Sequence, residues 1–292
     1  MLSLHTNASA LSTQNSLSST QKSLATSMTR LGTGFRVNSA MDDAAGLQIA
    51  TRLDAQTRGM AVAQRNTQNG ISMLQTGEGA LNEVSNILLR MKDLATEAFS
   101  ASSTATDKTA MQGEYDALGT ELTNIVKNTS FGGTQLFSDG TTIDGTLGKM
   151  SAAMSFQIGA SAGESMSVDV STQLTALTTA LGTVSTQYAA TPAAGTELSA
   201  TTNTLLTTIG GAIDKVGELR ASFGAAANRL DHVYNNLQNM STNTAAAKGR
   251  IMDTDYAAES STMTTKQMLM QSGTAMLKQS NSMSGLVMSL LG

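Results

Sequence analysis

The sequence predicts a mainly α-helical protein of long antiparallel helices, with terminal coiled-coil arms and a small β-hairpin region. Three observations lead to this fold class. Apolar heptad repeats occupy both ends of the chain, helical patterns of tens of residues fill most of the interior, and period-two alternation is confined to one short stretch. A chain of 292 residues is long enough to bury a sizeable core.

The N-terminal arm carries a narrow apolar stripe. Leu17, Leu24 and Leu31 repeat every seven residues. Met28 and Phe35 fill the intervening phase. This spacing is typical of a coiled-coil seam. The C-terminal arm has two adjacent stripes, and these form a broader apolar face. The first comprises Met263, Met270, Leu277 and Leu291, and the second Leu269, Met276, Met283 and Leu290.

Each arm has about 40 residues and little apolar surface. Ordering one residue costs roughly 1–2 kcal/mol of conformational entropy, and a single narrow seam buries too little to offset that cost in a monomer. We therefore expect the arms to fray alone and to order when packed on copies of themselves. The seam residues thus predict a self-assembling helical protein. A solvated coiled-coil stalk or a soluble helical bundle is the alternative.

Residues 42 to about 100 follow a helical pattern, interrupted by Gly59, Gly70, Gly77 and Gly79. Each glycine costs roughly 1 kcal/mol relative to alanine inside a helix, so this helix has to gain its stability from packing. A second helical pattern opens at Asp107, the expected N-cap. A third runs from Ile209 to Leu237.

Residues 152–170 alternate between apolar and polar side chains around a glycine-containing connection, which predicts a β-hairpin. Residues 171–200 are rich in Thr, Ala and Ser and hold the only proline, Pro192. We interpret this stretch as a short variable segment, helical through Leu174–Val184 and a surface loop beyond.

Composition excludes several classes of function. The net charge of −4 and the aromatic content of 3% argue against nucleic-acid binding. No cysteine is present for thiol catalysis or disulfides, and no apolar run approaches the length of a membrane span. The N-terminus lacks the regions of a cleavable signal peptide, so the protein either stays inside the cell or leaves by another route.

Two carboxylate pairs are the best candidates for chemistry, Asp42–Asp43 and Asp253/Asp255. A metal site would need further ligands nearby, and acid–base catalysis a second partner in a pocket. We expect these side chains to cap helix ends, or to pair with arginines, instead. No enzyme activity, metal or cofactor is predicted.

Longer motifs identify a family. TRLGTGFRVNSAMDDAAGLQIATRL at 29–53 and QRNTQNGISMLQTGEGALNEV at 64–84 resemble the N-terminal signature of bacterial flagellins. The segments 219–237 and 249–281 resemble the family's returning helices. The resemblance covers roughly residues 1–137 and 200–292. Only a short middle separates the two halves, so it indicates a short flagellin with little or no outer variable domain.

The resemblance implies a domain organisation. Residues 1–42 and 251–292 would be the paired terminal arms of the filament core, and 43–250 the helical second domain. It also implies a secreted structural subunit that leaves through the flagellar type III apparatus. This subunit would polymerise through its terminal helices into the extracellular flagellar filament for motility.

The implied partners are other copies of the chain, an export chaperone on the C-terminal arm from about Thr254, and the filament cap and hook-junction proteins. Toll-like receptor 5 is a further implied partner, with Arg90, Leu94 and Glu114 at the family's contact positions. Two other readings stay open. One is a hook–filament junction protein, and the other is a secreted helical adhesin or immune ligand that acts as a monomer.

Overall fold

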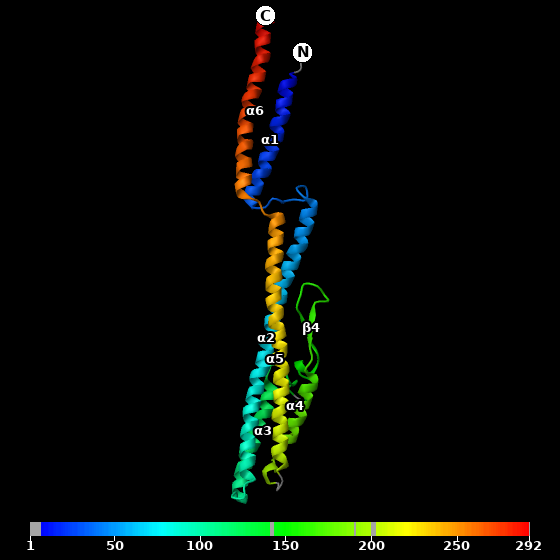
Figure 1. The fold of residues 1–292 in the computed structure, drawn as a ribbon. Helices are drawn as coiled ribbons and strands as arrows, with labels where there is room; N and C mark the ends of the chain where they lie inside the picture. The colour runs from blue at the N-terminus through cyan, green and yellow to red at the C-terminus, as the bar shows by residue number, and fades with distance from the viewer. Residues whose placement is uncertain (1–6, 141–142, 190, 200–202, 292) are drawn as a thin grey trace. The chain divides into compact units, whose positions relative to one another are not determined.

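A computed structural model describes residues 7–140, 143–189, 191–199 and 203–291, and only the backbone of 283–291 (Figure 1). Within these ranges the chain is mainly helical, as the sequence predicts. Long helices flank a short segment of strands and turns. The α-helices are α1 (Ala8–Thr33), α2 (Ala44–Ala98), α3 (Ala105–Asn128), α4 (Ser171–Val184), α5 (Thr204–Met252) and α6 (Tyr256–Leu291).

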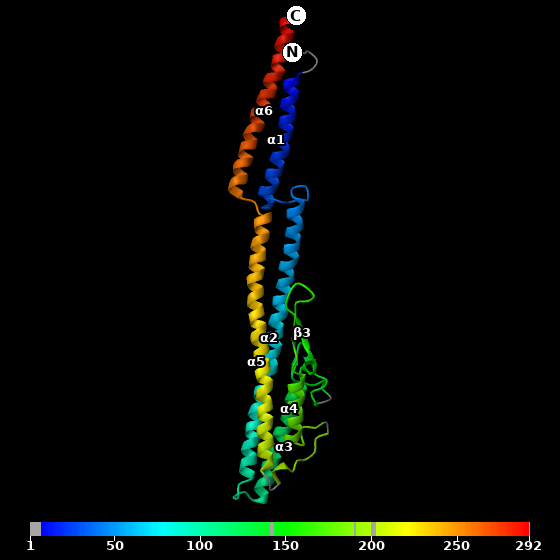
Figure 2. The same ribbon diagram turned by 45° about the vertical axis from the view of Figure 1, so that its right-hand side comes forward.

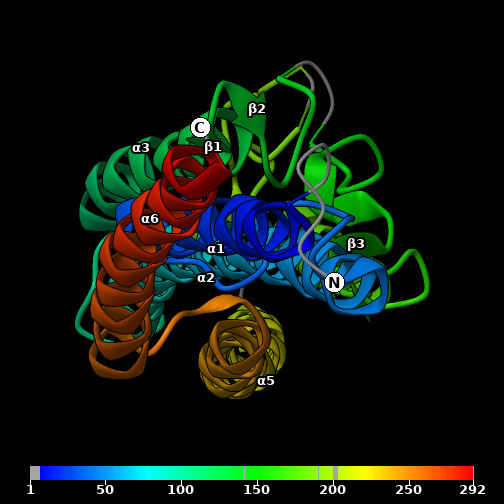
Figure 3. The same cartoon turned by 90° about the horizontal axis from the view of Figure 1, so that it is seen from above.

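The predicted β-hairpin is present. Strand β3 (Met154–Gln157) pairs antiparallel with β4 (Ser165–Val168), and Phe156 lies opposite Met166. A smaller hairpin, β1 (Ser130–Phe131) with β2 (Thr134–Gln135), precedes it and was not expected from the sequence. Its turn is Gly132-Gly133, where both residues have positive φ. Figure 3 shows the two strand pairs as separate features.

The chain divides into two compact units. One comprises Met1–Thr57 with Thr242–Gly292, and the other Arg58–Ser241. The division falls inside α2 and α5, whereas the sequence placed it at the helix boundaries near residues 42 and 250. Both clusters of buried apolar side chains belong to the Arg58–Ser241 unit.

The core of the Arg58–Ser241 unit lies among α2, α5 and the segments between them. Leu81 and Leu88 of α2 and Leu219 of α5 are almost completely buried. Phe137 and Phe223 stack with ring centroids 6.4 Å apart and planes 6° from parallel. Burial of a large apolar side chain contributes roughly 1.5–3 kcal/mol, so a core of this size stabilises the unit without the arms.

Three glycines of α2 mark close approaches rather than weak points. A Cβ on Gly59 would lie 2.7 Å from the Cβ of Ala160, and one on Gly70 would lie 2.9 Å from the ring of Phe156. A Cβ on Gly77 would lie 2.9 Å from the ring of Phe223. The helix therefore offsets the cost of these glycines through packing, as expected. Gly79 has open space around it, and nothing in the structure explains its presence.

Helix α3 begins differently from the prediction. Thr104, not Asp107, is the N-cap, and its hydroxyl accepts a hydrogen bond from the Asp107 N–H. The Asp107 carboxylate accepts in return from the Thr104 N–H at 2.9 Å. This is a capping box, which satisfies two backbone donors at once. Aspartate at the third helical position was mistaken for the cap itself because aspartate is also a favoured N-cap.

The unit that contains both chain ends is built mainly from α1 and α6. These helices lie side by side in Figures 1 and 2. Among its described residues, the buried apolar side chains are those of Leu24, Val37 and Ala50. So small a set stabilises two long helices only weakly.

Candidate assembly surface

One stripe of each arm faces the other arm within the same chain. Leu24 is buried, and Leu17 and Leu31 are half-buried on α1. On α6, Met263, Met270 and Leu277 are half-buried in the same phase. Gly273 lies against Leu17, since a Cβ there would be 3.4 Å from the leucine Cδ1. This stripe is the intrachain seam.

The second stripe of each arm is open to solvent. Met28 on α1, Phe35 just beyond the end of α1, and Leu269 and Met276 on α6 are between 41% and 63% exposed. We call these four residues the outer stripe. The sequence grouped both stripes into one assembly seam, and the structure separates them. The side chains of Met283, Leu290 and Leu291, also predicted for the seam, lie outside the described residues.

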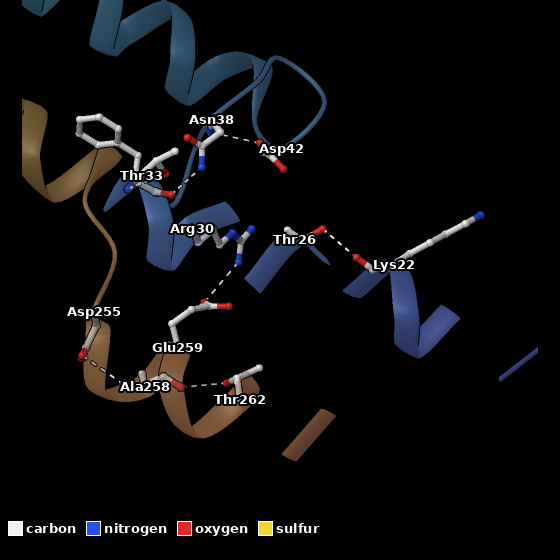
Figure 4. A network of polar contacts seen from close by, with 11 residues as sticks. Lys22, Thr26, Arg30, Thr33, Asn38, Asp42, Asp255, Ala258, Glu259 and Thr262 are labelled. Atoms are coloured by element: carbon white, nitrogen blue, oxygen red, sulfur yellow. Dashed lines mark hydrogen bonds and ion pairs between the residues drawn. The ribbon is translucent and has the colours of Figure 1, made fainter. Parts of the chain in front are cut away.

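Polar contacts hold the two arms in register. Asn7 caps α1 by accepting from the Ala10 N–H, and its Nδ2 donates to the Ser280 carbonyl at 3.1 Å. Nearer the other end of α1, Arg30 Nη1 lies 3.7 Å from Glu259 Oε2 (Figure 4). These contacts set which turn of α1 lies against which turn of α6. They therefore also set the direction in which the outer stripe faces.

The chain leaves α1 through a turn that hydrogen bonds hold against residues 251–254. Gly34 ends the helix at φ 78°, and its carbonyl accepts from the Thr254 N–H at 2.9 Å. Phe35 and Asp253 form an isolated antiparallel bridge. The backbone N–H of Arg36 donates to the Met252 carbonyl, and the Arg36 guanidinium donates to the Ile251 carbonyl at 2.9 Å. The end of one arm and the start of the other are therefore joined by backbone hydrogen bonds.

Among the candidate carboxylates, Asp43 and Asp255 cap helix starts, and Asp42 closes the turn before α2. Asp42 accepts from the N–H groups of Asn38 and Ser39, and these hydrogen bonds lower its pKa (Figure 4). Asp43 accepts from Gly46 N–H at the start of α2, and Asp255 from Ala257 N–H at the start of α6. In the described part of the chain, no three potential metal ligands come together.

The candidate receptor residues separate into two environments. Arg90 of α2 and Glu114 of α3 form an exposed pair, with Nη2 2.7 Å from Oε1 and Nε donating to the same oxygen at 2.8 Å. The hydrogen bond that the Arg90 guanidinium donates to the Glu114 carboxylate raises the pKa of Arg90. Leu94 is only 2% exposed, because it falls with Met91 and Ala98 on the core face of α2. This corrects the expectation that Leu94 offers a surface contact.

Sequence reasoning missed two exposed methionines in the unit that contains both chain ends. Met41 is 97% exposed in the turn before α2, and Met268 is 59% exposed beside Leu269. Met41 follows no helical period, so no pattern marked it. Met268 is adjacent to Leu269 in the sequence but belongs to neither heptad stripe of the C-terminal arm. None of the described helices combines the length and hydropathy that crossing a bilayer requires.

A mainly helical fold whose terminal helices expose apolar stripes defines a structural protein built for packing against other chains. Residues 4–142 match the family model described as the bacterial flagellin N-terminal helical region, and residues 206–291 match the flagellin C-terminal helical region. The chain belongs to the bacterial flagellin family. It is a structural subunit that assembles with its own copies into the extracellular flagellar filament of motile bacteria, and it is not an enzyme.

Two flagellins that align over the whole chain agree with this assignment. Polar flagellin F of Vibrio parahaemolyticus is 33% identical, and flagellin B of Vibrio anguillarum is 32% identical, with all of both chains covered in each case. A crystal structure of Bacillus cereus flagellin is 37% identical over 63% of this chain and 94% of that chain, with a TM-score of 0.47. The alignment with the first relative extends over 385 positions against 292 residues here, so this chain is a short member.

Proposed function

We propose that this chain polymerises through its terminal helices, and that the outer stripe is the surface through which α1 and α6 contact neighbouring copies. A single observation carries the proposal. Four large apolar side chains stay exposed on or directly beside α1 and α6, whose own packing buries little: Met28, Phe35, Leu269 and Met276. The intrachain seam supports the pairing of the arms, and the outer stripe is free to join one pair to the next.

The free energy of apolar burial favours these separate roles for the intrachain seam and the outer stripe. Burying a large apolar side chain contributes roughly 1.5–3 kcal/mol, so the outer stripe offers a gain that the monomer does not use. On a helix the neighbours of a side chain on the same face stand three and four residues away, and none of those around Met28 or Met276 is charged. Close packing between copies would therefore meet little like-charge repulsion.

Two substitutions test the proposal. Met28→Gln and Met276→Gln keep helix propensity and side-chain length but remove apolar surface. In seeded polymerisation, the double variant should raise the critical concentration more than tenfold. Leu147→Gln, which alters an exposed apolar residue outside the arms, is the matched control and should leave it unchanged. Equal critical concentrations for the double variant and the control would overturn the proposal.

Deletion of residues 254–292 is a stronger test. Both buried apolar clusters lie between residues 60 and 237, so the Arg58–Ser241 unit should keep its circular dichroism and cooperative unfolding. Polymerisation should be abolished. Filaments formed by the truncated chain would contradict the model, and arms that are fully ordered in a dilute, non-polymerising monomer would favour a monomeric adhesin.

The C-terminal arm is also proposed as the export chaperone site. Before secretion the exposed apolar residues of α6 have to be covered by a binding partner, because exposed patches of this kind promote non-specific association. A chaperone on residues 254–292 would supply it. Leu269→Gln with Met276→Gln should weaken chaperone binding by calorimetry, whereas Met28→Gln on α1 should not. The filament cap and hook-junction proteins are proposed as contacts at the filament's two ends.

Recognition by Toll-like receptor 5 is proposed to use Arg90 and Glu114, because this ion pair is exposed on neighbouring helices. Arg90→Ala and Glu114→Ala monomers should each activate the receptor less than the parent chain, with unchanged circular dichroism. Lys92→Ala, on the same helix, is the control. Undiminished activation by both variants would remove this part of the proposal.

A further inference from the structure

The methionine side chains of this chain differ widely in exposure. There are 18 methionines and no cysteine. Within the described residues, the buried methionines all lie between residues 60 and 166, in the unit that holds the apolar core; they are Met60, Met73, Met91, Met150, Met154 and Met166. On the helices α1 and α6, Met28, Met268 and Met276 are more than half exposed, and Met41 is exposed in the turn before α2.

This segregation determines where an oxidant would react. With no thiol in the chain, the methionine thioether is the side chain that mild two-electron oxidants attack, and access to the sulfur governs the rate. Sulfurs packed in the core are shielded by neighbouring side chains. The exposed thioethers of α1 and α6 are open to solvent in the unassembled subunit.

We propose that Met28, Met268 and Met276 form an oxidation site that controls assembly, with peroxides as the chemical class of reagent. Hydrogen peroxide transfers one oxygen atom to the thioether sulfur. The peroxide O–O bond breaks, the S–O bond forms, the sulfur loses two electrons, and water leaves. Each modified side chain becomes a sulfoxide, which is polar and chiral where the thioether was apolar.

The effect on assembly follows from desolvation. The inference rests on the proposed function, in which Met28 and Met276 become buried between copies. A sulfoxide carries a strong acceptor oxygen, and burying it without a hydrogen-bond donor is costly. An oxidised subunit therefore joins the polymer poorly, although its own fold is intact because the core methionines are not modified.

The same geometry protects the finished polymer. Once Met28 and Met276 are covered by neighbouring copies, peroxide no longer reaches their sulfurs. Oxidation then acts on free subunits and spares assembled ones, and methionine sulfoxide reductase would restore the modified subunits. The site is thus a reversible check on which subunits enter the filament.

The test compares full-length chains before and after limited hydrogen peroxide treatment. Peptide mass spectrometry of the monomer should find sulfoxide at Met28, Met268 and Met276 at least tenfold more than at Met91 or Met150. The critical concentration of the treated chain should rise at least tenfold, and treatment with sulfoxide reductase should return it to the starting value. Pre-formed filaments should show much less oxidation at Met28 and Met276.

A matched pair of variants assigns the effect. The triple variant Met28→Leu, Met268→Leu, Met276→Leu keeps apolar surface without sulfur and should polymerise equally well with and without peroxide. The control Met41→Leu, Met240→Leu removes two exposed methionines outside α1 and α6, one in the turn before α2 and one on α5. This control should stay peroxide-sensitive. A triple variant that loses polymerisation on peroxide treatment, or a control that becomes resistant, would overturn the inference.

Failure of the inference is distinguishable from failure of the proposed function. If the untreated Met28→Gln, Met276→Gln chain polymerises normally, the outer stripe is not the assembly surface and the proposed function fails. If that chain fails to polymerise while the fully oxidised parent still assembles, the assembly surface stands and the oxidation site is refuted.

Discussion

Gly77 of α2 lies directly against the ring of Phe223 of α5, where a Cβ would be 2.9 Å from the ring and 3.4 Å from both Met150 and Phe137. Phe223 is itself stacked on Phe137, so it has little freedom to move away. Two residues further along α2, Gly79 has no neighbour within 4 Å. The same helix thus holds a glycine required by packing and one with no such requirement.

Alanine substitutions at these two positions should have opposite effects. Gly77→Ala should lower the free energy of unfolding by about 1–3 kcal/mol, because it forces an extra methyl into a filled core. Gly79→Ala should raise it by about 0.5–1 kcal/mol through helix propensity. Urea unfolding of full-length chains, followed by circular dichroism, measures both. A stabilising Gly77→Ala would contradict the close packing described here.

Leu24 and Met28 should also behave differently, although they are one turn apart on α1. Leu24→Ala should reduce protection of the α1 amides in monomer hydrogen exchange, with a cost of about 2–3 kcal/mol to the local opening free energy. Met28→Ala should leave that protection unchanged and raise the critical concentration for polymerisation. Equal exchange in the two variants would mean that Leu24 does not hold the arm pair together.

Gln112 should hold the segment after α4 on α3. Its Nε2 donates to Asp116 and Glu197, each at 2.8 Å, and its Oε1 accepts from the Leu198 N–H at 2.8 Å. Gln112→Leu leaves that buried N–H without a partner, so it should cost about 1–3 kcal/mol. Hydrogen exchange should increase at 193–199. Thr120→Ala, an exposed change on the same helix, is the control and should leave that segment protected.

The capping box at α3 predicts a pH dependence. Hydrogen bonds from the Thr104 hydroxyl and N–H hold the pKa of Asp107 below its ordinary value. A carboxyl whose pKa is lower in the folded state stabilises the fold above the unfolded-state pKa, near 4, and that stabilisation is lost as pH falls through the folded-state pKa. Asp107→Asn should therefore show a smaller decrease in unfolding free energy between pH 6 and pH 3 than the parent. The same decrease in both would exclude this role for the cap.

Local sequence patterns were sufficient for the helices and the hairpin. Leu81 and Leu88 stand seven residues apart, which fits the period of a helix. The alternation around Phe156 fits the period of a strand. They were not sufficient to decide which apolar residues of an arm stay exposed. Leu24 and Met28 both fit the 3-4 seam, and only the position of α6 around the axis of α1 decides that Leu24 is covered and Met28 is not.

The misplacement of Leu94 has a similar origin. A motif match places Leu94 beside Arg90 in the sequence but does not say which way each side chain points. The helical period could have indicated its burial, because Leu94 stands three residues after Met91 and four before Ala98, both on the core face. Thr104 was missed for a different reason, since threonine and aspartate three residues apart are each acceptable caps and only the hydrogen bonds distinguish them.

The hydrogen bond between Asn7 and Ser280 joins residues 273 positions apart. A ribosome completes the first of these residues long before the second, so α1 has no partner for almost the whole of translation. A nascent or truncated chain would carry both faces of α1 uncovered, the one that α6 will cover and the one left for other copies. The remainder of α1 is rich in hydroxyl groups and weakly charged. During synthesis this polar surface also limits association between nascent chains.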